Sequence, residues 1–198
     1  MNIISIKILR NIIEVITEDN KNKWEKLGNE HPIQVDESVI IKGKLIKPPS
    51  EMYDSISKAT WIIGAVEEKT RKLVLKVLPN GKKETFCDFF SENFSLMSVI
   101  KTDGHRSYPY AVAGIGGVHK IVNHEEGFTN ADGDHTNLIE CEWSHFKSDL
   151  KTRKGIPGYS MPGYIEEYVW RRRNLKTHDS NAQKNAFFTL LKLLIQNK

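Results

Sequence analysis

The order in which strand-like and helix-like segments alternate is the feature that most restricts the fold of this chain. A run rich in β-branched residues at positions 33–41 predicts a first strand. Apolar runs at 61–66 and 73–78, separated by the polar residues 67–71, predict a hairpin. The later segments read as helix, strand, helix, strand and three helices, at residues 85–94, 98–104, 108–113, 119–123, 137–150, 164–173 and 183–195. This order predicts an α/β fold with one mixed central sheet flanked by helices.

The segments outside these elements suggest a short N-terminal extension. Apolar residues recur at helical spacing between positions 4 and 16, and a polar stretch at 18–30 reads as a connector. We therefore expect an N-terminal helical segment at residues 1–30 and a main domain at residues 31–198. A Lys- and Pro-rich stretch at 42–49 predicts a loop after the first strand.

Composition excludes several classes of protein. The longest apolar runs, such as residues 61–66, are far shorter than the roughly 20 residues that span a bilayer. Cys87 and Cys141 form no C-x-x-C pair, which favours a reducing compartment. A net charge of +4 with a pI near 8.9 is compatible with a polyanionic partner. We expect a soluble intracellular protein that does not contact membranes.

Three acids occupy positions that suit metal-dependent phosphoryl transfer. Such chemistry on a nucleic acid uses two hard cations about 4 Å apart, held by carboxylates on rigid elements. Asp36 lies in the first predicted strand, Asp103 closes the fourth, and Glu140 lies in the first turn of the clearest helix. Because neighbours in a strand point to opposite faces, only one of Asp36 and Glu37 should face the metals, and alternation does not say which.

Each acid also has an ordinary structural explanation. Asp36 and Glu37 could be a solvated pair, Asp103 could serve the turn at Gly104, and Glu140 could complete a capping box with Asn137. Two other chemistries have little support in the sequence. A zinc site would use His119, His124, His135 and Cys141. A cysteine nucleophile would be Cys87 or Cys141.

Taken together, the segments resemble the DDE transposases of the Merlin superfamily and the related bacterial insertion-sequence transposases. The resemblance runs from about residue 33 to residue 175 and rests on the order and spacing of linked blocks, at residues 35–38, 61–67, 102–104, 119–124, 135–147 and 164–173. It implies a ribonuclease H-like fold in which Asp36, Asp103 and Glu140 bind two Mg²⁺ or Mn²⁺ ions and catalyse DNA cleavage and strand transfer. Within the most specific block, His135, Asn137 and Trp143 would support the site.

The resemblance also implies partners. These are transposon ends, target DNA and further copies of the chain in a homodimer or larger homo-oligomer, in a nucleus or a bacterial nucleoid according to the host. The side chains expected to contact DNA phosphates are basic residues after Glu140, namely Lys147, Lys151, Arg153, Arg171, Arg172 and Arg173. Because family members usually carry a DNA-binding region ahead of the catalytic domain, residues 1–30 would be its remnant. The alternatives are a truncated or domesticated DNA-binding protein without activity, and another ribonuclease H-like nuclease such as a repair enzyme.

Overall fold

The computed structural model describes residues 3–41, 44–46, 60–122, 130, 133–175 and 180–196. The chain divides into two compact units, which we name the sheet unit (Glu25–Tyr159) and the helical unit (Met1–Trp24 with Ser160–Lys198). The predicted division of function between residues 1–30 and 31–198 stays a prediction.

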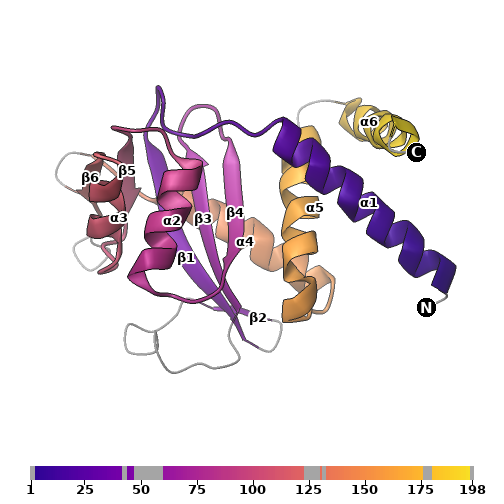
Figure 1. Cartoon of the computed structure of the whole chain (residues 1–198), viewed down its shortest axis with the longest axis horizontal. Helices are drawn as coiled ribbons and strands as arrows, with labels where there is room; N and C mark the ends of the chain where they lie inside the picture. The colour runs from indigo at the N-terminus through magenta and orange to yellow at the C-terminus, as the bar shows by residue number, and fades with distance from the viewer. Residues whose placement is uncertain are drawn as a thin grey trace. The chain divides into compact units, whose positions relative to one another are not determined.

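The sheet unit is built on one mixed sheet (Figure 1). Its strands β1 to β6 are, in chain order, Ile33–Ile41, Lys44–Ile46, Thr60–Glu67, Leu73–Leu78, Val99–Thr102 and Val118–Ile121. The order across the sheet is β4-β3-β1-β5-β6, with β2 paired to the end of β1. Strands β3 and β4 run antiparallel to their neighbours, whereas β5 and β6 run parallel to β1. The predicted α/β fold with one mixed central sheet flanked by helices is confirmed.

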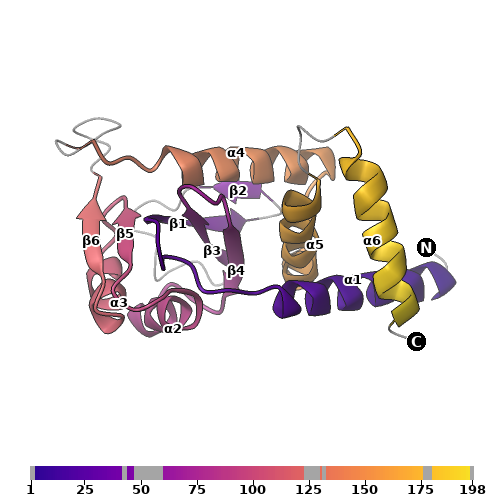
Figure 2. The same ribbon diagram turned by 90° about the horizontal axis from the view of Figure 1, so that it is seen from above.

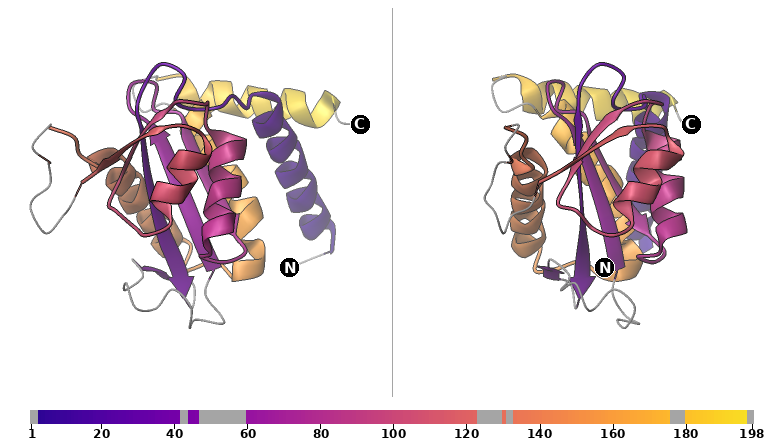
Figure 3. Two further views of the ribbon diagram at one scale, coloured as in Figure 1. Left: turned by 60° about the vertical axis from the view of Figure 1, so that its left-hand side comes forward. Right: turned by 90° about the vertical axis from the view of Figure 1, so that its left-hand side faces the viewer.

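Helices cover both faces of this sheet. Figures 2 and 3 show α4 (Asn137–Thr152) on one face, and α2 (Lys83–Asn93) and α3 (Tyr108–Gly114) on the other. The strands alternate accordingly. Val35 and Val39 of β1 join Phe86 and Phe90 of α2 in one buried core, whereas Gln34 hydrogen-bonds to the start of α4. Even-numbered residues at this part of β1, Asp36 among them, therefore face α4.

Strand β2 corrects the prediction of a loop at residues 42–49. Val39, Ile40 and Ile41 of β1 pair antiparallel with Ile46, Leu45 and Lys44. The prolines that suggested a loop, Pro48 and Pro49, follow the strand and lie outside the described residues. The pairing arises because β1 presents free backbone groups along one edge, which a local sequence pattern does not reveal.

The helical unit contains α1 (Ile3–Asn22), α5 (Met161–Asn174) and α6 (Ala182–Gln196). A 3-10 turn (Gly158–Ser160) spans the boundary in the chain just before α5. Helix α1 runs further than the helix predicted at 4–16, into the expected connector. Polar contacts to α5 explain the extension, because Asn20 donates to Glu166 and Asp19 accepts from Trp170. Among the described residues, no helix combines the length and apolar character that a membrane span requires.

Asp19 is the buried charge that ties α1 to α5. Its side chain is 5% exposed, and its Oδ2 accepts the Trp170 indole N–H at 2.9 Å and the Arg173 guanidinium at 2.5 Å. Lys23 contacts the other oxygen at 2.9 Å. One buried carboxylate thus contacts three donors, two on α5 and one just after the end of α1.

Removing this carboxylate should therefore destabilise the helical unit. We expect Asp19→Ala to lower the free energy of unfolding by about 2–3 kcal/mol, because a buried indole N–H and a guanidinium lose their acceptor. Urea unfolding followed by circular dichroism measures the change. Glu18→Ala, at the exposed neighbouring position, is the control and should change little. Equal stability of the two variants would contradict the role given to Asp19.

Candidate functional site

Asp36 and Asp103 come together because of the register between β1 and β5. These strands pair in parallel at Ile33 with Ile100 and at Gln34 with Lys101, an offset of 67 residues (100 − 33). Asp103 follows Asp36 by the same offset (103 − 36). The two acids are therefore level with each other, although no strand pairing joins them.

The sheet opens at this point on one edge of β1. Strand β3 pairs with β1 from Ile33 to Ile40, so it occupies the other edge along nearly the whole strand. On the open edge, β5 pairs only at residues 33–34 and β2 only at residues 39–41. Asp103 directly follows β5, and Gly104 turns the chain away with a φ of +90°, a conformation that favours glycine. Asp103 thus belongs both to the turn expected at Gly104 and to the predicted metal site.

Three carboxylates gather at this opening. One oxygen each from Asp36, Glu37 and Asp103 lie within 4.8 Å of one another. We expected that only one of Asp36 and Glu37 could reach the site. The Oδ1 atom of Asp36 accepts a hydrogen bond from the Glu37 backbone N–H at 2.9 Å. The two carboxylates leave opposite faces of β1, and both reach its open edge. Alternation along a strand determines the face of the sheet on which a side chain begins. It does not determine the position of the oxygen atoms at the end of a flexible carboxylate.

Tyr108 shows how strongly negative this site is. Its ring is fully buried, and its hydroxyl donates a hydrogen bond to Glu37. Burial and the nearby charges of Glu37, Asp36 and Asp103 raise the pKa of Tyr108 well above its usual value. The hydroxyl therefore stays protonated and keeps donating. Sequence reasoning admitted only one of Asp36 and Glu37 to the site. It missed Tyr108, because this residue shows no periodicity that differs from an ordinary helix.

These residues fit a divalent cation by their chemistry. Mg²⁺ and Mn²⁺ prefer hard oxygen ligands, and the site offers three carboxylates on rigid elements. Ionised carboxylates this close repel one another, and a cation between them would offset that repulsion.

Glu140, the third predicted acid, lies on α4. It is in the first turn of α4, and its Oε1 accepts a hydrogen bond from the Thr136 hydroxyl at 3.0 Å. Helix α4 packs on the face of β1 from which the Asp36 side chain projects. This follows because Gly64 is the strand partner of Asp36, and Trp143 of α4 fills the space above that glycine. Among the described residues, Glu140 does not join the three-acid group. The alternative capping box with Asn137 does not form, because Thr136 is the N-cap and makes no side-chain cap.

The predicted DNA-contacting residues differ in their surroundings. Lys147 and Lys151 are exposed on α4, and Arg172 is exposed on α5. The others contact carboxylates: Arg153 lies 3.6 Å from Asp149, Arg171 lies 3.2 Å from Glu167, and Arg173 lies 2.5 Å from Asp19.

Of the residues expected to support the site, His135 approaches Gln34 and Trp143 packs over Gly64, whereas the side chain of Asn137 is exposed.

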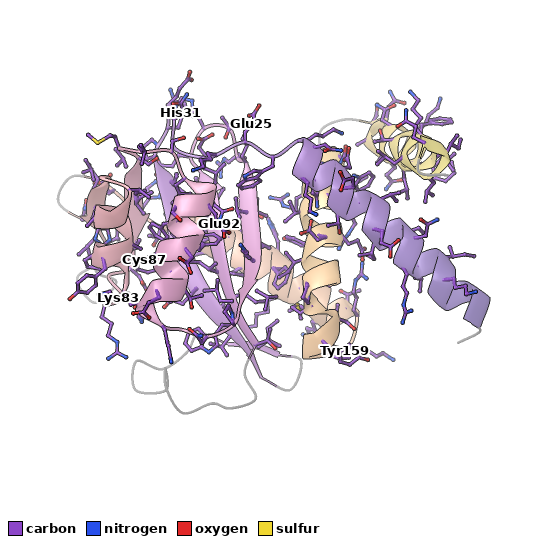
Figure 4. The ribbon with its side chains drawn as sticks, in the orientation of Figure 1. Glu25, His31, Lys83, Cys87, Glu92 and Tyr159 are labelled. Carbon is purple, nitrogen blue, oxygen red and sulfur yellow. The ribbon has the colours of Figure 1, made fainter. Side chains whose placement is uncertain are left out.

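The two weaker chemistries gain no support from the described residues. His119, His135 and Cys141 join no group with metal-ligand geometry there, and His124 lies outside them. His119 instead contacts the Thr102 hydroxyl at 2.9 Å, and burial lowers its pKa. Cys87 lies on α2 (Figure 4), on the face opposite α4, and burial raises its pKa, which disfavours the reactive thiolate.

The close approach of α4 to the sheet predicts that Gly64 cannot be enlarged. A Cβ at this position would lie 2.9 Å from Trp143, 3.0 Å from Ile139 and 3.0 Å from Leu75. We expect Gly64→Ala to cost about 1–3 kcal/mol of stability by overpacking. Gly114→Ala, at the end of α3 with nothing within 4 Å of the added carbon, is the matched control and should be neutral or slightly stabilising. Thermal unfolding compares them, and equal melting temperatures would contradict this packing.

No curated protein gives a significant match. Among solved structures that match in fold is the cryo-EM structure of a simian T-cell lymphotropic virus intasome in complex with PP2A regulatory subunit B56 gamma. That match has a TM-score of 0.49 and 12% identity, and covers 83% of this chain and 56% of the other, so this chain spans little more than half the length of its neighbour.

The family comparison is more direct. The model of the ISXO2-like transposase domain matches residues 27–173, well over half of the 198 residues. The matched segment contains Asp36, Asp103 and Glu140 together with all six strands of the sheet. The chain therefore belongs to the ISXO2-like transposase domain family, a family of DDE transposases.

Proposed function

We propose that this chain is the catalytic core of a DDE transposase that cleaves DNA at the ends of a mobile element and joins those ends to target DNA. The observation that carries the proposal is the meeting of Asp36 and Asp103, 67 residues apart, at an opening in the sheet beside α4. The family match supports the same assignment. The order and spacing of the residue blocks favour the Merlin-type branch, and a phylogeny placing residues 27–173 elsewhere would contradict that finer assignment.

We assign Asp36, Asp103 and Glu140 as the carboxylates that would hold two Mg²⁺ or Mn²⁺ ions. When bound, these ions supply the Lewis acidity that phosphoryl transfer needs at the attacking and leaving oxygens. Asp36 is fixed in β1 and Asp103 at the end of β5, so paired backbone holds both. Rigid placement matters because phosphoryl transfer is catalysed mainly by positioning and by electrostatic stabilisation.

Glu140 is a better third carboxylate than Glu37 because of the face that each occupies. Glu37 leaves β1 on the α3 face, is 4% exposed, and already binds the Tyr108 hydroxyl. Glu140 is partly exposed on α4, the helix that covers the face of Asp36. In this arrangement Glu37 holds Tyr108 and adds negative charge, whereas Asp36, Asp103 and Glu140 face the DNA.

Helix α4 also presents basic residues that suit a phosphate backbone. Lys147 follows Glu140 by seven residues, about 10 Å along a helix, too far to pair with it directly. Lys147 and Lys151 are both exposed, so they would contact phosphates that run past the carboxylates. Arg172 would add a further contact. The ion pairs of Arg153 and Arg171 are only partly buried i,i+4 pairs, which are weak enough to exchange for phosphate.

The three proposed carboxylates should each be required for cleavage. We expect Asp103→Asn and Glu140→Gln to lower Mg²⁺-dependent cleavage of element-end DNA by at least about 100-fold, since each removes a charged ligand needed in the transition state. Single-turnover cleavage on gels measures the loss. Asp88→Asn, an exposed acid on α2, is the matched control and should cut like the wild type. In Figure 4, Lys83 and Glu92 mark the two ends of that helix.

The same variants separate this proposal from its rivals. Cleavage by Asp103→Asn at the wild-type rate would rule the proposal out. DNA binding by the wild type without Mg²⁺-dependent cutting would favour the inactive DNA-binding protein. Cleavage without joined products would favour a ribonuclease H-like nuclease of another kind.

The basic face of α4, formed by Lys147 and Lys151, should contribute to DNA binding through charge. We expect Lys147→Ala and Lys151→Ala each to weaken DNA binding across all sequences and to reduce the salt slope of log K by about 1, because each phosphate contact releases counterions. Fluorescence anisotropy at several salt concentrations measures the slope. Lys76→Ala, which removes the same charge from β4, where Lys76 pairs with Glu92 of α2, should leave the slope unchanged. An unchanged slope in both α4 variants would place the DNA elsewhere.

A further inference from the structure

Gln34 is a buried polar side chain that acts on α4 from a strand. It lies in β1, two residues before Asp36, and is 0% exposed. Its Oε1 accepts hydrogen bonds from the backbone N–H groups of Leu138 at 2.9 Å and Ile139 at 3.3 Å. The first amides of a helix have no partner within the helix, and the side chain of the N-cap Thr136 makes no capping hydrogen bond to them. The cap of α4 is therefore provided by β1.

The other end of the Gln34 amide is fixed as well. Its Nε2 donates to Glu68 Oε1 at 2.9 Å and lies 3.3 Å from His135 Nδ1. A flipped amide would set its NH₂ group against the two backbone N–H groups of α4, so the network determines its orientation. Glu68 is held in turn by the Lys101 ammonium at 2.7 Å.

The segment that leads into α4 is anchored to the sheet by a second set of contacts. Asp134 is buried and accepts from Lys101 of β5 at 2.9 Å and from Lys120 of β6 at 2.8 Å. Burial by itself would raise the pKa of Asp134, but the hydrogen bonds from Lys120 and Lys101 lower it to about 2. The aspartate is charged at neutral pH, and the two lysines hold the chain two residues before the N-cap.

These contacts link the strand of one proposed carboxylate to the helix of another. Ile139, whose amide Gln34 binds, is the residue immediately before Glu140. We propose that Gln34 is a positioning residue that sets the first turn of α4, and with it the Glu140 carboxylate, relative to Asp36. This inference rests on the proposed function, in which both acids hold the metal ions.

The reason that such a residue is needed is the tolerance of the chemistry. Catalytic carboxylates must be held within about 0.5 Å of their productive geometry. Hydrophobic packing of Ile139 and Phe146 keeps α4 on the sheet, but it does not fix a sliding or rotation of the helix as directional hydrogen bonds do. Gln34 makes two such bonds to α4 from the strand that carries Asp36.

Two substitutions separate the acceptor from the rest of the side chain. Gln34→Leu keeps the approximate volume and removes both polar atoms. Gln34→Glu, made together with Glu68→Gln so that the residue at position 68 donates to the new carboxylate instead of repelling it, keeps an oxygen acceptor for the two amides. We expect Gln34→Leu to speed hydrogen exchange of the Leu138 and Ile139 amides and to lower Mn²⁺-dependent cleavage by about 10- to 100-fold, as is usual when a group supporting a metal ligand is lost. Gln34→Glu combined with Glu68→Gln should retain amide protection and recover most of the cleavage.

The control must lose stability without touching α4. Phe89→Leu serves this purpose, since Phe89 is buried in the core on the opposite face of the sheet. It should lower the melting temperature and leave both the two amides and the cleavage rate unchanged. If Phe89→Leu loses as much cleavage as Gln34→Leu at equal stability, or if Gln34→Leu leaves the amide exchange unchanged, the positioning role is overturned.

One further comparison separates this inference from the function on which it rests. Wild-type cleavage by Glu140→Gln would contradict the proposed function itself. Wild-type cleavage by Gln34→Leu, together with an inactive Glu140→Gln, would overturn the positioning role alone. Because amide exchange is read without metal or DNA, it tests the cap in either case.

Discussion

The parallel pairing of β5 with β1 is the constraint on which the rest of the site depends. It consists of only two residue pairs, Ile33 with Ile100 and Gln34 with Lys101. Parallel neighbours must be joined by a crossover connection, and here β2, β3, β4 and α2 lie between the two strands in the chain. A shift of one residue in this short register would move Asp103 away from Asp36 and turn its side chain to the other face. The register of this short pairing therefore sets the distance between two acids.

Buried polar groups around this register are arranged for position more than for stability. Lys101, Glu68 and Asp134 form a charged network that a purely apolar interior would not need, and buried ion pairs add little net stability. The close approach of Asp36, Glu37 and Asp103 is unfavourable while all three are ionised. A fold that retains both features gives up some stability to hold groups in defined places, as functional sites commonly do.

The sequence predicts those parts of the fold that have a local pattern. The strand at residues 33–41, the helix beginning at Asn137 and the place of Asp103 at a strand end all follow from periodicity and turn chemistry. Contacts between distant residues are not visible in this way. Gln34 looks like an ordinary polar position in a strand, yet its partners are 104 and 105 residues away. The extension of α1 likewise depends on Trp170, which is 151 residues from Asp19.

The three consecutive arginines show why a run of charge in a sequence is not a surface patch. Successive residues of an α-helix are rotated by about 100°, so Arg171, Arg172 and Arg173 must point in three directions. Arg173 turns inward to Asp19, Arg171 lies along the helix toward Glu167, and Arg172 is the most exposed of the three. Of the three, Arg172 is therefore the side chain most accessible to a phosphate backbone. On α4, by contrast, Lys147 and Lys151 are four residues apart and share one face, which makes that helix the stronger candidate for guiding DNA past the carboxylates.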